Sequence, residues 1–292
     1  MLKRVPKWYQ RYGNICIWIL AAVCVVMTLN CTILYHGSPL TERYAISAGS
    51  TGEYGLQEIE ILRNYVVEQV NALSRGFDRD ENGYILYEGD LKAEAKVQMR
   101  RLSAQFDCLS GYYPSPKKFF ASDFFSQQYM MGYYFPFSME ANYNGRMYVV
   151  NMPATMCHEL SHLKGIIRED EANFIAYLAC VDAEDTLFRY SAYVSVLTYV
   201  DRDYRKALAR SLTDAEPIIA IDEQVHKDNI FLTQEAWEQV EKGAVFNTEL
   251  VKEVSGTIVE TNLNINGVSD GRISYSRVVD LLLQYYDGIL YG

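Results

Sequence analysis

The sequence is poor in the residues that would build a disulfide framework. It has six cysteines in 292 residues, and three of them fall in or at one apolar segment near the N-terminus. Cys108, Cys157 and Cys180 are left for the rest of the chain, and three thiols do not make a framework of paired bridges. Cys157 and Cys180 stand in apolar helical patterns, which predicts buried thiols rather than metal ligands.

Basic residues are outnumbered by acidic ones outside the N-terminus, 23 to 37. Residues 1–35 carry four positive charges and no acidic residue, and removing these four from the net charge of -10 leaves -14 for residues 36–292. A body this acidic repels nucleic acid, and it contains no basic stripe that would reverse the repulsion. We therefore expect no nucleic-acid partner. The chain also lacks internal repeats and low-complexity tracts, so a repeat architecture is not indicated.

One segment has no charge at all. Residues 15–34 are a run of twenty uncharged, mostly apolar residues, and twenty residues of helix span roughly 30 Å, the thickness of the hydrocarbon core of a bilayer. We predict a transmembrane signal anchor over 15–35. A cleaved signal peptide fits less well, because the run is long and no small-x-small cleavage site follows it; a buried soluble helix is the other alternative.

The charge pattern around this segment predicts its orientation. The basic residues precede the apolar run, and positive charge is retained on the cytoplasmic side of a membrane. Residues 1–14 should therefore be a cytoplasmic N-terminus, and the body should be extracytoplasmic. The predicted location is the cell membrane, crossed once.

The rest of the chain predicts a linker followed by one domain. Residues 36–55 hold several Gly, Ser and Thr residues, a composition typical of linkers. Residues 56–292 are predicted to form one mainly helical α+β domain. Residue spacing and composition predict helices over Leu56–Leu73, over Leu91–Phe106 and from Asn151 and Pro153 onward, and short strands at Tyr84–Tyr87, Tyr133–Phe137 and Arg146–Val150.

The most specific motif is His158-Glu159-Leu160-Ser161-His162. Two histidines four residues apart on one helix present both imidazoles on the same face, where they can share one metal ion. Glu159 lies beside them and can act as a base on a metal-activated water, as in zinc peptidases. The chain has only four histidines, so the motif arises by chance in roughly three of a thousand such chains. Apolar flanking residues predict a largely buried helix, and buried His and Glu side chains need partners such as a metal.

A third ligand is expected downstream of the motif. Arg168 stands where metzincins have a third histidine, so that pattern fails. Glu169-x-x-Ala172-Asn173 resembles the Glu-x-x-Ala-Asp helix of gluzincins, which implies Glu169 as a zinc ligand and Asn173 as the residue that hydrogen-bonds a ligand histidine. This chain has Asn where that helix has Asp. Glu171 is the alternative ligand, and an acidic first helical turn without any metal is the other interpretation.

Longer stretches around these residues resemble one known family. They look like domain of unknown function 3810, an uncharacterised bacterial membrane family. The resemblance covers nearly the whole chain from the membrane helix onward and implies a membrane-bound, metal-dependent peptidase with a zincin-like domain. Many members look to have more membrane helices than the one seen here. The matching stretches are Cys157-His-Glu-Leu-Ser-His162 with Gly165, Arg168-Glu-Asp-Glu-Ala-Asn-Phe174, Tyr134-Phe-Pro-Phe137, Glu140-Ala-Asn142, Tyr190-Ser-Ala-Tyr193, Ser274-Tyr275 and Val278-Val-Asp-Leu-Leu-Leu283.

An acidic run near residue 80 has a second interpretation. Asp78-Arg-Asp80-Glu-Asn82-Gly83 resembles the first half of a calcium loop, with oxygen donors at alternate positions and glycine at the sixth. The twelfth position, where a bidentate Glu is needed, is Gly89. A hairpin or turn built on Asn82-Gly83 is the simpler interpretation.

Aromatic residues offer two further functional hypotheses. An edge strand at Tyr133–Phe137 or Arg146–Val150 could pair with an extended peptide, although aromatic residues more often pack the core. Tyr190, Tyr193 and Tyr275 could each donate a hydrogen bond to an oxyanion, and each is more often a structural residue.

The sequence therefore predicts a membrane-anchored zinc metallopeptidase that acts on a peptide or protein outside the cytoplasm. Zn2+ would be bound by His158, His162 and Glu169, or Glu171 in its place, with Glu159 as the base. An alternative from another class is a zinc-stabilised binding or sensor module without turnover. Glu159 favours catalysis, because a purely structural site has no use for a base. A third alternative binds no metal.

Overall fold

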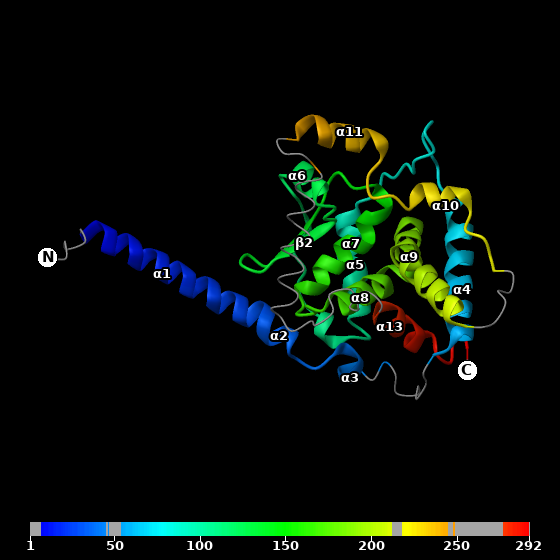
Figure 1. Cartoon of the computed structure of the whole chain (residues 1–292), viewed down its shortest axis with the longest axis horizontal. Coiled ribbons are helices and arrows are strands. Elements are labelled where there is room, and N and C mark those ends of the chain that lie inside the picture. The colour runs from blue at the N-terminus through cyan, green and yellow to red at the C-terminus, as the bar shows by residue number, and fades with distance from the viewer. Residues whose placement is uncertain are drawn as a thin grey trace.

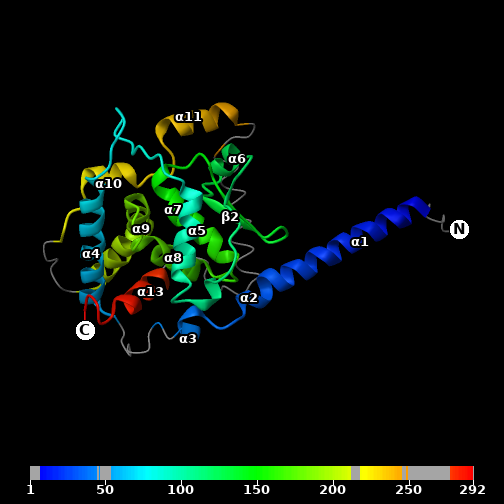
Figure 2. The ribbon, with the colours of Figure 1, turned by 180° about the vertical axis from the view of Figure 1, so that it is seen from behind.

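A computed structural model describes residues 7–44, 46, 54–211, 218–244, 248 and 277–291. These residues form a mainly helical body with a small sheet, and one apolar helix projects from it (Figures 1 and 2). The helices are α1 (Lys7–Met27), η1 (Thr28–Thr32), α2 (Ile33–Tyr35), α3 (Leu40–Tyr44), α4 (Leu56–Ser74), α5 (Leu91–Leu102), η2 (Asp107–Leu109), α6 (Ser122–Gln127), η3 (Val149–Asn151), α7 (Met152–His162), α8 (Glu169–Val181), α9 (Thr186–Arg210), α10 (Glu223–Asp228), α11 (Gln234–Gly243) and α13 (Arg277–Tyr286). The strands are β1 (Lys117–Lys118), β2 (Gly132–Phe135) and β3 (Glu140–Tyr143).

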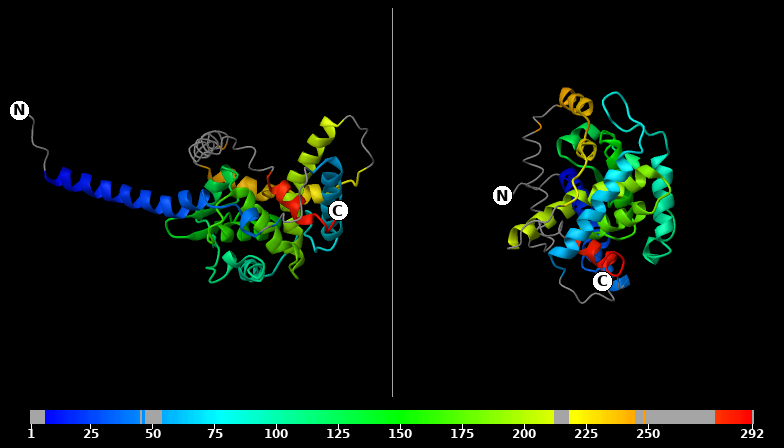
Figure 3. Two further views of the ribbon diagram at one scale, coloured as in Figure 1. Left: turned by 90° about the horizontal axis from the view of Figure 1, so that it is seen from below. Right: turned by 90° about the vertical axis from the view of Figure 1, so that its right-hand side faces the viewer.

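The projecting helix runs without a break from α1 through η1 and α2. It covers Lys7–Tyr35 and is, in the described part of the chain, the one helix long and apolar enough to cross a membrane. Its side chains are exposed or half-buried, and it points away from the body in Figures 1 and 2 and in the left view of Figure 3. The alternative of a buried soluble helix is therefore wrong. The helix begins at Lys7, ahead of the predicted span at 15–35.

The first part of the predicted linker is packed against the body. It contains the short helix α3, whose first residue, Leu40, is fully buried. The backbone N–H of Leu40 donates to Oε1 of Glu171 at 2.7 Å, and Nη2 of Arg168 donates to the carbonyl oxygen of Gly37 at 2.8 Å. These bonds connect the end of the projecting helix to the chain that leads into α8.

The helical core has α7 at its centre, packed against α8, α9 and α5, with α4 against the outer side of α9 (Figure 1). The predicted helix over Leu56–Leu73 is confirmed as α4. Aspartates begin two of the core helices: Asp90 accepts from two backbone N–H groups of α5, and Asp185 accepts from two of α9. Such caps pair donors that a helix start leaves free, and they fix where each helix begins.

The sheet has strand order β1-β3-β2, with β3 parallel to β1 and antiparallel to β2. The prediction at Tyr133–Phe137 is confirmed as β2, which is an edge strand. The prediction at Arg146–Val150 is wrong: Val149–Asn151 is a helical turn, and the backbone N–H of Tyr148 donates to the carbonyl oxygen of Phe231 instead of to a strand. The apolar run was mistaken for a strand because its residues pack inward without forming a ladder.

Candidate metal centre

Helix α7 carries both histidines of the motif. It begins as predicted, with Asn151 before it and Pro153 in its first turn. The imidazole rings of His158 and His162 are nearly perpendicular, at 86°, with centroids 4.6 Å apart. Nδ1 of His162 lies 2.7 Å from the carbonyl oxygen of Ile166, so this nitrogen is the donor and Nε2 has its lone pair free for a ligand.

A tight turn brings α8 back beside α7. Gly165 has a φ of 82°, a left-handed conformation that favours glycine, and the chain reverses there. Glu169, the first residue of α8, then faces the histidines, with Oε2 3.1 Å from Nε2 of His158 and Oε1 3.7 Å from Nε2 of His162. The ligand atoms of the three side chains lie within 4.8 Å of one another. One small cation can reach all three.

Glu159 projects from the same helix into the body. It is 5% exposed, and its Oε2 makes no hydrogen bond with any described residue. Gly132, at the start of β2, packs so closely on this carboxyl group that a Cβ there would stand 2.4 Å from Oε1. Burial raises the pKa of Glu159 to about 8, opposed by the charge of His158 and supported by that of Glu169. A buried carboxyl oxygen without a partner costs free energy unless a ligand completes the site.

The three candidate ligands shift one another's pKa. Burial alone would lower the pKa of His158, but its hydrogen bond to Glu169 and the nearby carboxylate charges raise that pKa to about 9. Burial acts to raise the pKa of Glu169, but the hydrogen bond and charge of His158 hold it at about 2. Burial and the charge of His158 lower the pKa of His162 to about 4. These shifts place the proton on His158, which pairs with the ionised Glu169, and a divalent cation bound here would displace that proton.

The structure separates the two acids that the sequence left open. Glu169 belongs to the cluster, whereas Glu171 is buried on another side of α8, where its Oε1 accepts from Leu40 N at 2.7 Å and from Arg168 at 3.4 Å. Asn173 hydrogen-bonds His158 with its side chain, the position in which it would orient a ligand ring.

Two residues of β2 belong to the site and were missed. Gly132 packs on Glu159, and the ring of Tyr134 lies 6.0 Å from that of His162. The strand itself was predicted from its aromatic residues, but nothing in that pattern says which helix it lies against. The close approach of a glycine to a helix is a tertiary contact, and only the position of Gly132 at the start of the strand hints at it.

The tyrosines considered as oxyanion donors lie elsewhere. The hydroxyl of Tyr190 donates to Oδ2 of Asp228 at 2.8 Å, and that of Tyr193 is 3.0 Å from the hydroxyl of Tyr65. Tyr275 lies outside the described residues. The two described tyrosines are buried structural residues.

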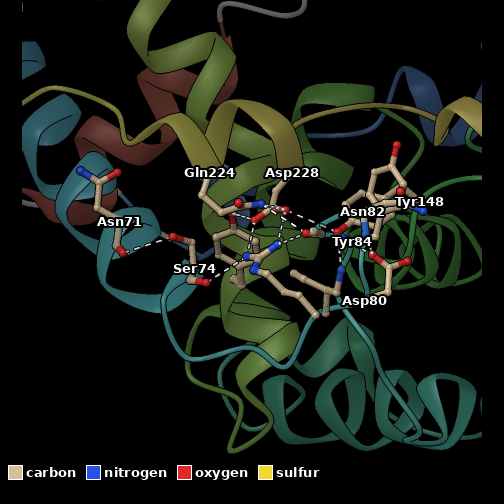
Figure 4. Close-up of polar contacts among 12 residues, drawn as sticks. Asn71, Ser74, Asp80, Asn82, Tyr84, Tyr148, Gln224 and Asp228 are labelled. Atoms are coloured by element: carbon tan, nitrogen blue, oxygen red, sulfur yellow. Dashed lines mark hydrogen bonds and ion pairs between the residues drawn. The ribbon is translucent and has the colours of Figure 1, made fainter.

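Asp228, at the end of α10, is the centre of a second polar cluster (Figure 4). Its carboxylate accepts from both Nη atoms of Arg79 at 2.8 Å, from Nε2 of Gln224 at 3.2 Å and from the hydroxyl of Tyr148 at 3.4 Å. With Tyr190 added, each carboxylate oxygen has at least two donors. This cluster has no free atom to offer a ligand among the residues described here.

The acidic run near residue 80 forms a turn, as the simpler interpretation predicts. Oδ1 of Asp80 accepts from the backbone N–H groups of Asn82 at 2.9 Å and Tyr84 at 2.8 Å, and Gly83 has a φ of 86°. In Figure 4, this turn lies beside Gln224 and Asp228. The aspartate oxygen is used to hold the turn, which resembles an Asx turn.

The fold and the cluster thus define a helical protein with one helix of membrane-spanning length and a buried Glu beside two His and a further Glu. The model of the family described as "Protein of unknown function (DUF3810)" matches residues 2–283, and the chain belongs to this family. No curated protein and no solved structure matches the chain.

Proposed function

We propose that the protein is a membrane-anchored, zinc-dependent metallopeptidase with a zincin-like arrangement of its site. The donor set supports zinc, because two imidazole nitrogens and one carboxylate are the ligands of many catalytic zinc sites. Outer contacts support it too: the carbonyl oxygen of Ile166 accepts from Nδ1 of His162, the ring nitrogen away from the ligand position, and the side chain of Asn173 contacts His158. Three protein ligands leave one position for a water or a substrate.

The single observation that carries the proposal is the buried, unpartnered Oε2 of Glu159 beside the three ligands. When bound, zinc would supply Lewis-acid activation of a water and of the scissile carbonyl group. Oε2 of Glu159 would take the proton from that water and deliver it to the leaving amine. The absence of a side chain at Gly132 makes room for this carboxyl group, because a Cβ there would stand 2.4 Å from its Oε1.

The membrane part of the proposal rests on the helix Lys7–Tyr35, which is apolar and exposed. Its basic residues precede the apolar run, which favours a cytoplasmic N-terminus and an extracytoplasmic body. The substrate would then be a peptide or protein outside the cytoplasm. An exposed apolar helix of this length is stable in lipid and costly in water.

The test uses the full chain in detergent, purified without chelators, beside two matched variants. Glu159→Gln removes the proposed base, and Glu68→Gln changes an exposed glutamate of α4. We expect about one zinc per chain in all three, and a loss of peptide hydrolysis of about a hundredfold or more in Glu159→Gln alone. If all three proteins hold zinc and none hydrolyses the peptide, the result would support a binding or sensor module. A native protein that holds no zinc would overturn the proposal.

A further inference from the structure

The hairpin formed by β2 and β3 has a row of exposed apolar side chains. Tyr133, Phe135, Phe137 and Met139 are 41–49% exposed. The ring centroids of Phe135 and Phe137 lie 5.3 Å apart, so the row is continuous at the tip. Large apolar side chains grouped in water are unfavourable, and such groups mark contact surfaces.

The hairpin tip is joined to the projecting helix. Nδ2 of Asn30, in η1, donates to the carbonyl oxygen of Pro136 at 2.9 Å, and Pro136 lies between the two exposed phenylalanines. Figures 1 and 3 show the β2–β3 hairpin leaving the body on the same side as α1 and in the same direction. The exposed row is therefore continuous with the apolar surface of that helix.

The depth of this junction can be judged from the helix. Asn30 stands five residues before Tyr35, where the helix ends, and a helix rises 1.5 Å per residue. The tip is bonded to Asn30, so it lies about 7 Å from the helix end, measured along the helix toward the membrane. This matches the depth of about 5–10 Å at which amphipathic segments lie in a membrane interface. Tyr and Phe side chains are common at that depth of the membrane interface.

The base of the same hairpin lies at the metal centre. Gly132 packs on Glu159, and Tyr134 lies beside His162. Gly132 and Phe137 are five positions apart in the chain, so even at the strand rise of 3.3 Å per residue they lie at most about 17 Å apart. A tip held in lipid would keep the site within that distance of the membrane surface.

We propose that the tip of the β2–β3 hairpin, residues 135–139, inserts into the membrane interface on the face of the membrane where the body lies. The metal centre would thereby act on membrane-proximal segments of anchored polypeptides. The inference rests on the proposed membrane anchoring and, for the substrate, on the proposed peptidase function. Lipid is the occupant favoured here because the exposed row continues the surface of the spanning helix. A second copy of the chain is the competing occupant.

The test for insertion uses tryptophan fluorescence of the full chain in phosphatidylcholine–phosphatidylglycerol vesicles with brominated acyl chains. Trp8, Trp18 and Trp237 are first replaced by Phe, and a single Trp is then introduced by Phe137→Trp or, as a control, by Leu86→Trp. Leu86 is exposed in the segment between α4 and α5, which lies away from α1 (Figure 2). We expect bromolipid to quench the Trp of Phe137→Trp severalfold more than that of Leu86→Trp.

Three results would separate the possible failures. If a protein that retains only Trp18 is not quenched, membrane anchoring itself is wrong. If Trp18 is quenched but the Trp of Phe137→Trp is quenched only by aqueous iodide, the anchor holds and the hairpin inference is overturned. If the Trp of Phe137→Trp is shielded from both quenchers and the chain migrates as a dimer, a second copy covers the tip and the inference is also overturned.

A functional arm tests the substrate class. The double variant Phe135→Ser and Phe137→Ser should keep its zinc content and its cleavage of a short soluble peptide. Cleavage of the same peptide attached to a lipid anchor should fall by about tenfold or more, because two buried rings are lost from the interface. Equal loss on both peptides, or no loss on either, would overturn the proposed role of the tip.

Discussion

The Asp228 cluster and the candidate metal centre are both groups of polar side chains within one helical body, but they differ in how their buried atoms are satisfied. Asp228 is fully buried, and two nitrogens of Arg79, one of Gln224 and the hydroxyls of Tyr148 and Tyr190 donate to its carboxylate. Such a network fixes the elements that it joins: α10, α9, η3 and the turn before α5.

The metal centre leaves atoms without partners. Oε2 of Glu159 has none in the described part of the chain, and the Nε2 atoms of both histidines depend on the single carboxylate of Glu169, which is itself 48% exposed. Native structures satisfy nearly all buried polar groups. Six buried side-chain atoms of the described residues lack a partner, and among them Oε2 of Glu159 belongs to the motif that carries the two candidate histidine ligands. The contrast is between a cluster that stabilises the fold and one that we propose binds a metal.

Removal of metal should affect only one of the two regions, and its effect on activity is the largest that we expect. Treatment of the full chain with EDTA should abolish peptide hydrolysis, and added Zn2+ should restore it, because the three ligands lose the cation that they share. Circular dichroism should show the helical content unchanged. If metal analysis shows no zinc and the protein still hydrolyses the peptide, the proposed function is contradicted.

Asp228→Ala should have the largest effect on stability. It leaves the buried guanidinium of Arg79 without its carboxylate, and breaking a buried pair in this way costs about 3–5 kcal/mol. Urea unfolding in detergent measures the change. The matched control on the same helix is Glu223→Gln, an exposed residue paired with Lys227, which should leave the midpoint unchanged. Equal midpoints for both variants would remove the distinction between the two clusters.

Glu169→Gln and Glu171→Gln form a pair that sharpens the comparison within α8. Glu169→Gln should weaken zinc binding by about a hundredfold or more with little change in stability, because it removes a charged ligand. Glu171→Gln should leave zinc binding intact and lower the free energy of unfolding by about 1 kcal/mol, since it weakens the bonds to Leu40 and Arg168. Zinc titration with a competing chelator measures the first effect, and reversal of the two affinities would assign the ligand to Glu171.

The parts of the structure that could be predicted from sequence are those set by local spacing. Apolar residues recur every three or four positions in α4, and this spacing, which predicts the helix, reflects which of its faces is buried. His158, Glu159 and His162 were visible because one helix holds all three. Confirmation of zinc and of catalysis awaits the measurements above.

The parts that could not be predicted depend on tertiary contacts. Strand β3 has the sequence Glu-Ala-Asn-Tyr, three residues of which are poor strand formers, and it exists because β1 and β2 pair with it on both sides. The choice between Glu169 and Glu171 depends on how the turn at Gly165 rotates α8. The approach of Gly132 to Glu159 joins residues far apart in the chain.

The three candidate ligands stand within twelve residues of the chain, from His158 to Glu169. Closing a loop this short takes little chain entropy, and α7 and α8 meet as a local helical hairpin. By contrast, α4 meets α9, and α13 meets α8, only after loops of about a hundred residues have closed. We therefore expect the ligand set to assemble early in folding and to persist when α4 or α13 opens. The amides of α7 should then have the slowest hydrogen exchange in the chain.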